Sequence, residues 1–252
     1  MITFFKSIFK TILLKPIYNL LMAIVWLVPG QNLGVSIIIL TLIIRLALYP
    51  ASAQSIDAQK KMKDLQPELD KIKTKCKGNK EEEAKATMAL YQRYKINPLS
   101  SCLPMLLQFP ILIILYYALR ISLDTSRFDL LYSFTPRPEI INPMFLGMNL
   151  AEPSIYLAVV SGIFQFIQSK MMMPKKDKKE AKKDGQNMMQ NILSNQMTYF
   201  FPILTIYIGT TIPAALTLYW LVTIIFSILQ QHIMTRKQNK SGINIKIREK
   251  NE

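Results

Sequence analysis

Residues 34–50 read GVSIIILTLIIRLALYP, an apolar run that is interrupted by one charge, Arg45. With Leu33 included, the run covers 33–50, and a helix of that length extends about 27 Å at 1.5 Å per residue. This length is close to the thickness of the hydrocarbon core of a bilayer, about 30 Å. The stretch therefore predicts a membrane-spanning helix that carries an arginine.

Four further apolar stretches follow along the chain. They cover residues 99–119, 154–173, 192–209 and 213–234, and the turn sequence GTTIP separates the last two. Half of the 252 residues are hydrophobic, and the charged residues, 19% of the chain, lie in blocks between the apolar runs. Such segregation is typical of membrane spans. The predicted fold is an all-α polytopic membrane protein with a five-helix transmembrane core.

The net charge of +15 is distributed unevenly among the remaining segments. Residues 51–99, 170–197 and 235–252 hold eleven, seven and six Lys and Arg, 24 in all, whereas 120–153 holds three. Because cytoplasmic loops are enriched in Lys and Arg, the Lys-rich loop 174–191, the basic tail 235–252 and segment 51–98 are expected to be cytoplasmic. Five spans then place loop 120–153 and the N-terminus outside. Nucleic-acid binding is the alternative explanation of the positive charge.

The first 32 residues are apolar but interrupted by lysines. We expect residues 1–32 to form an amphipathic helix in the extracytoplasmic interface of the membrane. Its apolar face would comprise Phe4, Phe5, Ile8, Phe9, Ile12 and Leu13. The longest uninterrupted run, 20–28, is too short to span the membrane. A cleaved signal peptide would need a small-residue cleavage site after this run, and none is present. A signal anchor is the alternative to the interfacial helix.

Segment 51–98 is predicted to be a cytoplasmic helical hairpin. Apolar side chains recur on one helical face at Ile56, Met62, Leu65, Leu69, Ile72 and Cys76. After the stop sequence Lys77-Gly78-Asn79, a second pattern runs through Ala84, Met88, Tyr91 and Tyr94. Pro67 is expected to kink or restart the first helix.

Polar side chains within the spans are the candidate functional residues. Arg45 costs about 2.5–3.5 kcal/mol in a span and needs water or a partner, unless its side chain reaches the headgroups by snorkelling. No Asp or Glu occurs in any predicted span. A hydrated cavity open to the cytoplasm would accommodate all of the polar groups, which are Arg45, Thr41, Gln108, Tyr219 and Trp220, with Gln165, Gln168 and Thr223 as secondary members. Taken singly, these amides and aromatic tips are also explained by interhelical hydrogen bonds and interface belts.

Enzymatic chemistry is not expected. His232 is the single histidine, so a two-histidine metal site is impossible, and the sequence has no phosphate-cradling glycine-rich loop. Neither Cys76 nor Cys102 has a metal-ligand or paired spacing, so both are expected to be free thiols. No metal or cofactor is expected.

Four segments together resemble the YidC membrane-insertase family, in the same order and spacing. They are GVSIIILTLIIRLALYP (34–50), LQPEL (65–69), INPLSSCLPMLLQFPILIILYYALR (96–120) and IPAALTLYWLVTIIFSILQQHIM (212–234). The resemblance covers nearly the whole chain from Lys15 to Met234. It implies an ATP-independent insertase of the bacterial cell inner membrane that acts on nascent membrane proteins, alone or with the Sec translocon.

The resemblance also implies roles for particular residues. Arg45 would lie in a hydrophilic groove open to the cytoplasm and to lipid, with Thr41, Gln108, Tyr219 and Trp220 at matching groove positions. The hairpin would receive substrate, and the basic tail would help to dock ribosomes; signal recognition particle components are further implied partners. The chain departs from larger family members in lacking a big extracytoplasmic domain, and from many short ones in lacking a lipoprotein-type signal.

Two rival functions remain at this stage. A solute transporter or channel would also have a polar cavity within the membrane, although no internal repeat of broken helices is visible. A non-catalytic assembly scaffold would form stable complexes and tolerate changes in the cavity.

Overall fold

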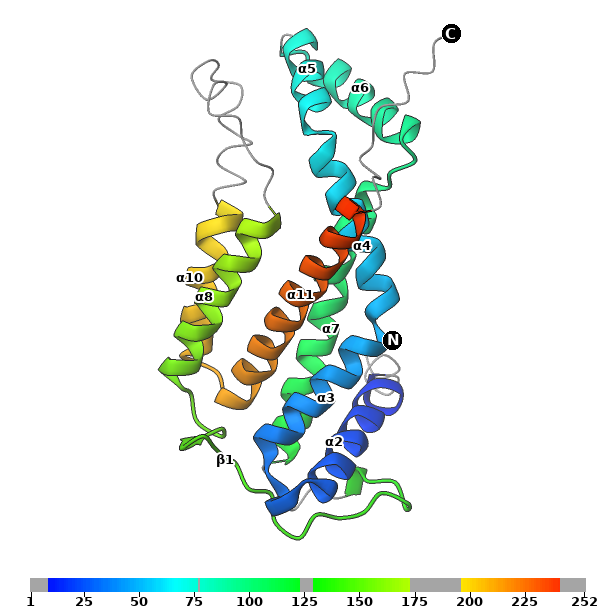
Figure 1. Cartoon of the computed structure of the whole chain (residues 1–252). Helices are drawn as coiled ribbons and strands as arrows, with labels where there is room; N and C mark the ends of the chain where they lie inside the picture. The colour runs from blue at the N-terminus through cyan, green and yellow to red at the C-terminus, as the bar shows by residue number, and fades with distance from the viewer. Residues whose placement is uncertain (1–8, 77, 123–128, 173–195, 241–252) are drawn as a thin grey trace. The chain divides into compact units, whose positions relative to one another are not determined.

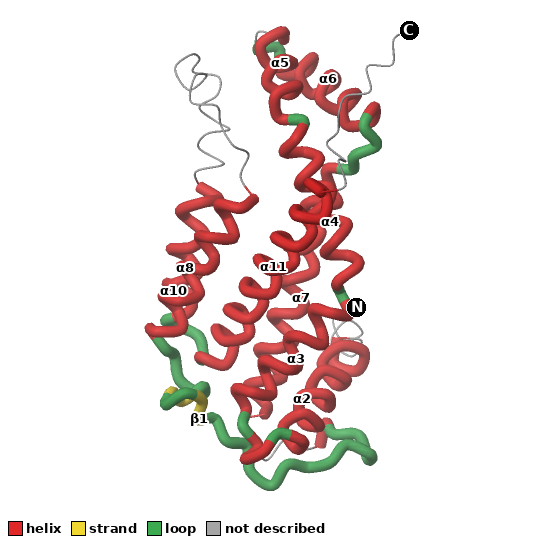
Figure 2. The backbone as a smooth tube through the Cα atoms, viewed as in Figure 1, coloured by secondary structure: helices red, strands yellow, loops and turns green. Residues whose placement is uncertain are grey.

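The computed structural model describes residues 9–76, 78–122, 129–172 and 196–240, and these residues are almost all helical (Figures 1 and 2). The predicted all-α membrane class is confirmed. The chain divides into a core unit, which comprises Met1–Leu48, Met105–Gln165 and Phe201–Phe226, and a hairpin unit, which comprises Tyr49–Pro104, Phe166–Phe200 and Ser227–Glu252. The predicted Lys-rich loop 174–191, most of the basic tail and the first eight residues lie outside the described residues.

The core unit begins with two helical segments that meet at a turn. A π-helical stretch, η1 (Phe9–Leu14), leads into α2 (Lys15–Leu27), and the short 3-10 helix η2 (Pro29–Gln31) connects α2 to α3 (Leu33–Ala47). Gly30 takes φ +70° in this turn, a conformation that glycine adopts without steric cost. The side chain of Asn32 then caps α3 by accepting a hydrogen bond from the backbone N–H of Val35 at 3.1 Å.

Helix α2 buries one face within the core unit. Tyr18, Leu21 and Val25 are fully buried, while Ile12 and Leu13, expected on the apolar face, are 63% and 40% exposed. Asn19 on α2 is also buried, donates to the carbonyl of Leu130 at 3.0 Å and accepts from the backbone N–H of Tyr132 at 2.7 Å. The segment therefore packs against protein on one side, and its depth in the membrane stays a prediction.

Parts of four more helices complete the core unit. They belong to α7 (Pro98–Ser122), α8 (Ile155–Met172), α10 (Phe201–Gly209) and α11 (Ala214–Lys240), and the π-helical stretch η5 (Gln196–Phe200) precedes α10. Buried side chains of α2, α3, α7 and α11 form one apolar cluster, which includes Leu21, Ile37, Leu115, Ala118, Ala215 and Tyr219.

The first amides of α11 are satisfied by a loop. The N–H groups of Ala214 and Ala215 donate to the carbonyls of Glu152 and Leu150 at 2.8 and 2.9 Å. A helix start leaves four such donors without partners in the helix, so this loop acts as a backbone cap.

One small strand pair departs from the predicted all-helical pattern. Strands β1 (Met144–Phe145) and β2 (Met148–Asn149) pair antiparallel around Leu146 and Gly147, which have φ +49° and +77°. Two successive positive φ values are those of a type I′ turn, the tightest hairpin connection. The strand pair was not predicted, because type I′ turns favour Asn-Gly or Asp-Gly over Leu-Gly.

In the hairpin unit, three helices follow one another: α4 (Tyr49–Asp64), α5 (Gln66–Cys76) and α6 (Lys80–Arg93). The break after Asp64 lies where Pro67 was expected to restart the helix, since proline supplies no N–H for the preceding turn. Asn79 begins α6, and its side chain accepts from the backbone N–H of Glu82 at 3.3 Å.

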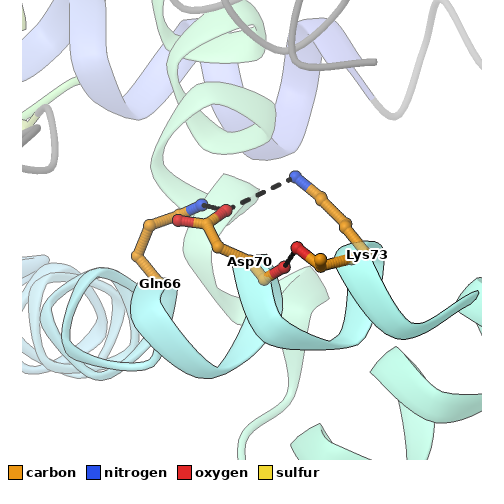
Figure 3. A network of polar contacts seen from close by, with 4 residues as sticks. Gln66, Asp70 and Lys73 are labelled. Carbon is orange, nitrogen blue, oxygen red and sulfur yellow. Dashed lines mark hydrogen bonds and ion pairs between the residues drawn. The ribbon is translucent and has the colours of Figure 1, made fainter. Parts of the chain in front are cut away.

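Helices α5 and α6 pack together through a small set of contacts. Leu65, Leu69 and Cys76 are buried, and the hydroxyl of Tyr94 donates to the carboxylate of Glu68 at 3.0 Å. On the outer surface of α5, Asp70 accepts from Gln66 at 3.0 Å and lies 3.9 Å from the ammonium of Lys73 (Figure 3). The expected apolar face of α6 is only partly covered, because Met88 is 51% exposed.

The described helices differ in their capacity to span a membrane. By length and composition, Ile155–Met172 and the part of α11 from Ala214 to Arg236 suffice, and α3 with α4 qualifies if the pair is one broken span. Thr11–Leu27, Gln108–Ser122 and Thr198–Gly209 are shorter apolar helical stretches. The five-span topology accordingly remains a prediction.

Helices α8 and α10 lie side by side in Figure 1, and glycines allow their close approach. A Cβ atom on Gly162 of α8 would overlap the side chain of Ile206 and lie 3.2 Å from the carbonyl of Pro202, both on α10. A Cβ atom on Gly209 would lie 2.8 Å from that of Ala158. Small residues are the usual means of packing helices in lipid, where no hydrophobic driving force holds them together.

Replacing Gly162 by Leu should therefore separate α8 from α10 and destabilise the protein by about 1–3 kcal/mol, the usual cost of overpacking. Thermal unfolding in detergent measures this change. Val160→Leu, on the 38% exposed neighbouring position, is the control and should unfold like the unsubstituted protein. Equal unfolding temperatures for the two variants would contradict the close packing.

In the hairpin unit, Tyr94→Phe should weaken the α5–α6 pair, because Glu68 loses its hydroxyl donor. The amides of α6 should exchange with solvent on the order of five-fold faster, as expected for a loss of about 1 kcal/mol. Hydrogen exchange with mass spectrometry reports the change. Tyr91→Phe removes a hydroxyl from the same helix and should leave exchange unaltered; equal effects of both would show that the Glu68 contact is immaterial.

Candidate functional site

Arg45 occupies the inward face of α3. It follows Ile37 and Thr41 at steps of four residues, and those two side chains are 1% and 0% exposed. Leu46, on the other face, is 61% exposed. Arg45 therefore lies on the side of α3 that faces the core unit, and its placement relative to the headgroups stays a prediction.

The guanidinium of Arg45 is held by a neutral partner from α7. Its Nη2 atom donates to Oε1 of Gln108 at 2.6 Å, a short distance that is typical of a charge-assisted hydrogen bond. Nε2 of Gln108 in turn donates to the hydroxyl of Tyr219 on α11 at 3.0 Å. We call Arg45, Gln108 and Tyr219 the arginine network.

The third member of the arginine network is the most deeply buried. Tyr219 is 1% exposed, and its hydroxyl also interacts with the side chains of Arg45 and Thr223. Thr223 lies one turn further along α11 and is 5% exposed. One continuous set of polar contacts therefore links α3, α7 and α11 across the core unit.

The charge of Arg45 has no acidic counterpart in this network. Lys61–Asp57, Lys73–Asp70 and Lys85–Glu81 are salt bridges of the hairpin helices, and none of them involves Arg45. Gln108 and Tyr219 satisfy hydrogen bonds of the guanidinium but leave its positive charge uncompensated. A planar guanidinium in that state is suited to bind a carboxylate, which offers complementary geometry and charge.

Thr41 and Trp220 lie close to Arg45 and Tyr219 along the sequence. No described hydrogen bond joins them to the arginine network. The hydroxyl of Thr41 donates to the carbonyl of Ile37 at 2.6 Å, within its own helix. Trp220 is half-buried on α11, next to Tyr219. Both residues were predicted because they are polar residues within a span. That criterion does not reveal that the hydroxyl of Thr41 already donates within its own helix.

The two glutamines of α8 are not joined to the arginine network by any described hydrogen bond. Gln165 is the last residue of α8 that belongs to the core unit, whereas Gln168 belongs to the hairpin unit. Both side chains are half-buried. Their assignment to the same groove as Arg45 stays a prediction.

A hollow of about 500 Å³ is present elsewhere in the core unit. It is lined by Gly30 and Gln31 of the turn before α3, and by residues 139–143 of the following loop. The hydrated groove at Arg45 is thus an expectation that rests on the chemistry of its residues.

Buried polar residues outside the predicted site were missed by sequence reasoning. In the hairpin unit, the amide of Gln230 donates to the hydroxyl of Ser52 at 2.9 Å and to the carbonyl of Tyr49 at 3.4 Å. Gln230 is only 4% exposed. Gln230 could have been predicted from the sequence, because it follows Tyr219 and Thr223 on α11 at near-helical spacing and therefore lies on the same helix face. Among the described residues, no group of three His, Cys, Asp or Glu side chains is placed to hold a metal ion.

Comparison with known proteins places these features in a family. A family model described as "60Kd inner membrane protein" matches residues 26–241, which include α3, α7, α11 and the arginine network. A relative from Fusobacterium nucleatum, named "Membrane protein insertase YidC", is 36% identical over 211 residues, which cover 82% of this chain and 87% of the relative.

Other relatives show the same extent of similarity. The "Membrane protein insertase YidC" of Clostridium tetani is 35% identical over 83% of this chain and 84% of its own length. The "Membrane protein insertase MisCA" of Bacillus subtilis is 34% identical over 81% of this chain and 71% of its own length.

Some relatives are much longer. The chain covers 34% of the length of "Membrane protein insertase YidC" from Anaeromyxobacter dehalogenans, at 35% identity over 208 residues. The match to the family model extends through every helix that contributes to the arginine network. The chain belongs to the family of 60Kd inner membrane proteins that includes the YidC membrane insertases.

Proposed function

We propose that this chain is a membrane protein insertase, which receives hydrophobic segments of nascent membrane proteins and releases them into the bilayer. Its curated relatives bear this name. The observation that carries the proposal is the Arg45 cation, which is held by Gln108 and Tyr219 in the core unit and has no acidic partner in the contacts described for it.

The physical problem of insertion is the polar flank of the client. A hydrophobic helix enters lipid readily, but the polar residues beside it must cross hydrocarbon, at several kcal/mol for each unsatisfied group. A hydrophilic groove that opens to the cytoplasm would shorten the dry part of that path. Arg45, Thr41, Gln108, Tyr219 and Trp220 are its proposed lining, with Gln165, Gln168 and Thr223 as secondary members.

The arginine gives the groove its selectivity for clients. Its uncompensated charge attracts acidic residues in the short translocated tail of the client. A carboxylate that reaches Arg45 exchanges its hydrogen bonds to water for charge-assisted hydrogen bonds to the guanidinium. The apolar segment meanwhile slides along the groove wall into lipid. Release follows because lipid is the better solvent for the completed helix. No bond is made or broken, so the proposed activity is not enzymatic.

The proposed placement is the bacterial inner membrane, with five spans, the N-terminus outside and the C-terminus in the cytoplasm. The asymmetry of 24 Lys and Arg against three supports this orientation. Helices α8 and α11, which are long and apolar enough to span, support the membrane location.

The hairpin helices and the basic tail are the proposed contacts for other components. Helices α5 and α6 have a small core of their own and leave Met88 exposed, which supports a role in receiving an apolar client segment. We propose the Sec translocon, the ribosome and signal recognition particle components as partners, with the basic tail helping to dock the ribosome.

A solute transporter or channel is the second candidate, because polar side chains buried within apolar helices are equally expected of a conduction path. Solute flux through proteoliposomes without insertion of a client would favour it. A passive assembly scaffold would instead form stable complexes and tolerate substitutions in the arginine network.

Replacing Arg45 tests the role of its charge. Arg45→Ala should reduce the insertion of a client with an acidic tail several-fold, and Arg45→Lys should largely restore it, because lysine keeps the charge but not the planar geometry. Protease protection of the client tail in proteoliposomes measures insertion. If all three proteins insert the client equally, the charge has no part in the mechanism.

Gln108→Glu separates the charge of Arg45 from its position. Glutamate has nearly the shape of glutamine and still accepts from Arg45, but it neutralises the guanidinium. Insertion of the acidic-tailed client should fall several-fold, while a client with a neutral tail should insert as before. Gln92→Glu, on the exposed surface of α6 outside the proposed groove, is the matched control and should leave the preference between the two clients unchanged. Full activity of Gln108→Glu on both clients would contradict an electrostatic role.

A further inference from the structure

The loop between α7 and α8 carries a leucine at an unfavourable position for a residue in water. Leu146 forms the tip of the β1–β2 turn, where it is 81% exposed and has φ +49°. Positive φ is uncommon for residues other than Gly, Asn and Asp. A leucine here combines backbone strain with exposed apolar surface, and an asparagine would relieve both in an aqueous setting.

Other apolar side chains of the same loop are similarly exposed. Phe134 is 81% exposed, Ile140 69% and Met144 48%. The loop leads into the start of α8, where Ile155 and Tyr156 are 62% and 75% exposed on a helix suited to span the membrane. An exposed set of large apolar groups of this kind marks an interaction surface.

The backbone of this loop is supplied with hydrogen bonds by the protein itself. Asn142 donates its N–H to the carbonyl of Gln31 at 3.1 Å and accepts from the N–H of Leu33 at 2.9 Å. The side chain of Gln31 accepts from the N–H of Ile140 at 2.7 Å, and that of Asn32 donates to the carbonyl of Met144 at 2.7 Å. Three positions, Pro136, Pro138 and Pro143, have no N–H to satisfy. These backbone groups therefore need no water as a hydrogen-bond partner.

The strand pair is also fixed to the beginning of α3. The side chain of Phe145 packs so closely on Gly34 that a Cβ atom there would overlap it. Together with the bonds to Asn32, this contact holds the turn in place within the core unit. Leu146 is therefore presented by a rigid support.

We propose that this loop is a lipid anchor, in which Phe134, Ile140 and Leu146 enter the interfacial layer of the bilayer next to the start of α3. The occupant of the surface is lipid, because the loop leads directly into α8, a helix suited to span the membrane, and because several backbone groups of the loop are bonded within the protein. The anchor fixes the depth of α3, and hence of Arg45, by contacts outside the spans. It goes beyond the proposed insertase activity and does not depend on it.

Spin labels test the depth of this loop in membranes. In a background with Cys76→Ser and Cys102→Ser, nitroxides are attached to Leu146→Cys and, separately, to Phe134→Cys. The protein is reconstituted in phosphatidylcholine–phosphatidylglycerol vesicles, and a nickel chelate is loaded on both sides by freeze–thaw. The accessibility of each label to oxygen, relative to the chelate, reports its depth.

Two reference positions calibrate the result. Glu81→Cys on α6 represents water, and Ile163→Cys on α8, 53% exposed in the core unit, represents lipid. Labels at Leu146 and Phe134 should give oxygen-to-chelate ratios several-fold above that of Glu81 and approaching that of Ile163. Ratios equal to that of Glu81 would overturn the proposal and indicate a surface reserved for a protein partner instead.

Discussion

The need to satisfy polar groups without water governs the core unit. Arg45 is the most demanding of these groups, because a charge within apolar helices must be hydrogen-bonded or hydrated. Gln108 from α7 meets this demand directly, and Tyr219 from α11 holds the amide of Gln108 in turn. These hydrogen bonds join three helices that are far apart in the sequence. The function proposed for the chain depends on the positive charge that Arg45 keeps within this network.

The same requirement explains other ties that have no direct part in insertion. The side chain of Asn19 on α2 donates to the carbonyl of Leu130 in the loop before α8, and the carbonyls of Leu150 and Glu152 cap α11. Gln230 performs a comparable task in the hairpin unit through Ser52. In hydrocarbon no hydrophobic force drives helices together, so hydrogen bonds and close glycine contacts fix the arrangement of helices.

Much of this arrangement was predictable because apolar length and proline or glycine breaks are local properties of the sequence. The stretch 34–50, the break near Pro67 and the turn before Ala214 illustrate this. Arg45, Gln108 and Tyr219 could be selected by chemical type, since polar groups are rare in spans. The internal hydrogen bond of Thr41 and the partners of Asn19 could not be selected, because they depend on helix packing. The strand pair around Leu146 was hidden by an atypical turn residue.

The hydrogen bond from Arg45 fixes the orientation of the Gln108 amide. Gln108 accepts from Arg45 through its oxygen and donates to Tyr219 through its nitrogen, and turning the amide around would place two donors, the amide nitrogen and the guanidinium, against each other. A substitution at Gln108 therefore perturbs two helices at once, because α3 and α11 are tied to opposite ends of one amide group.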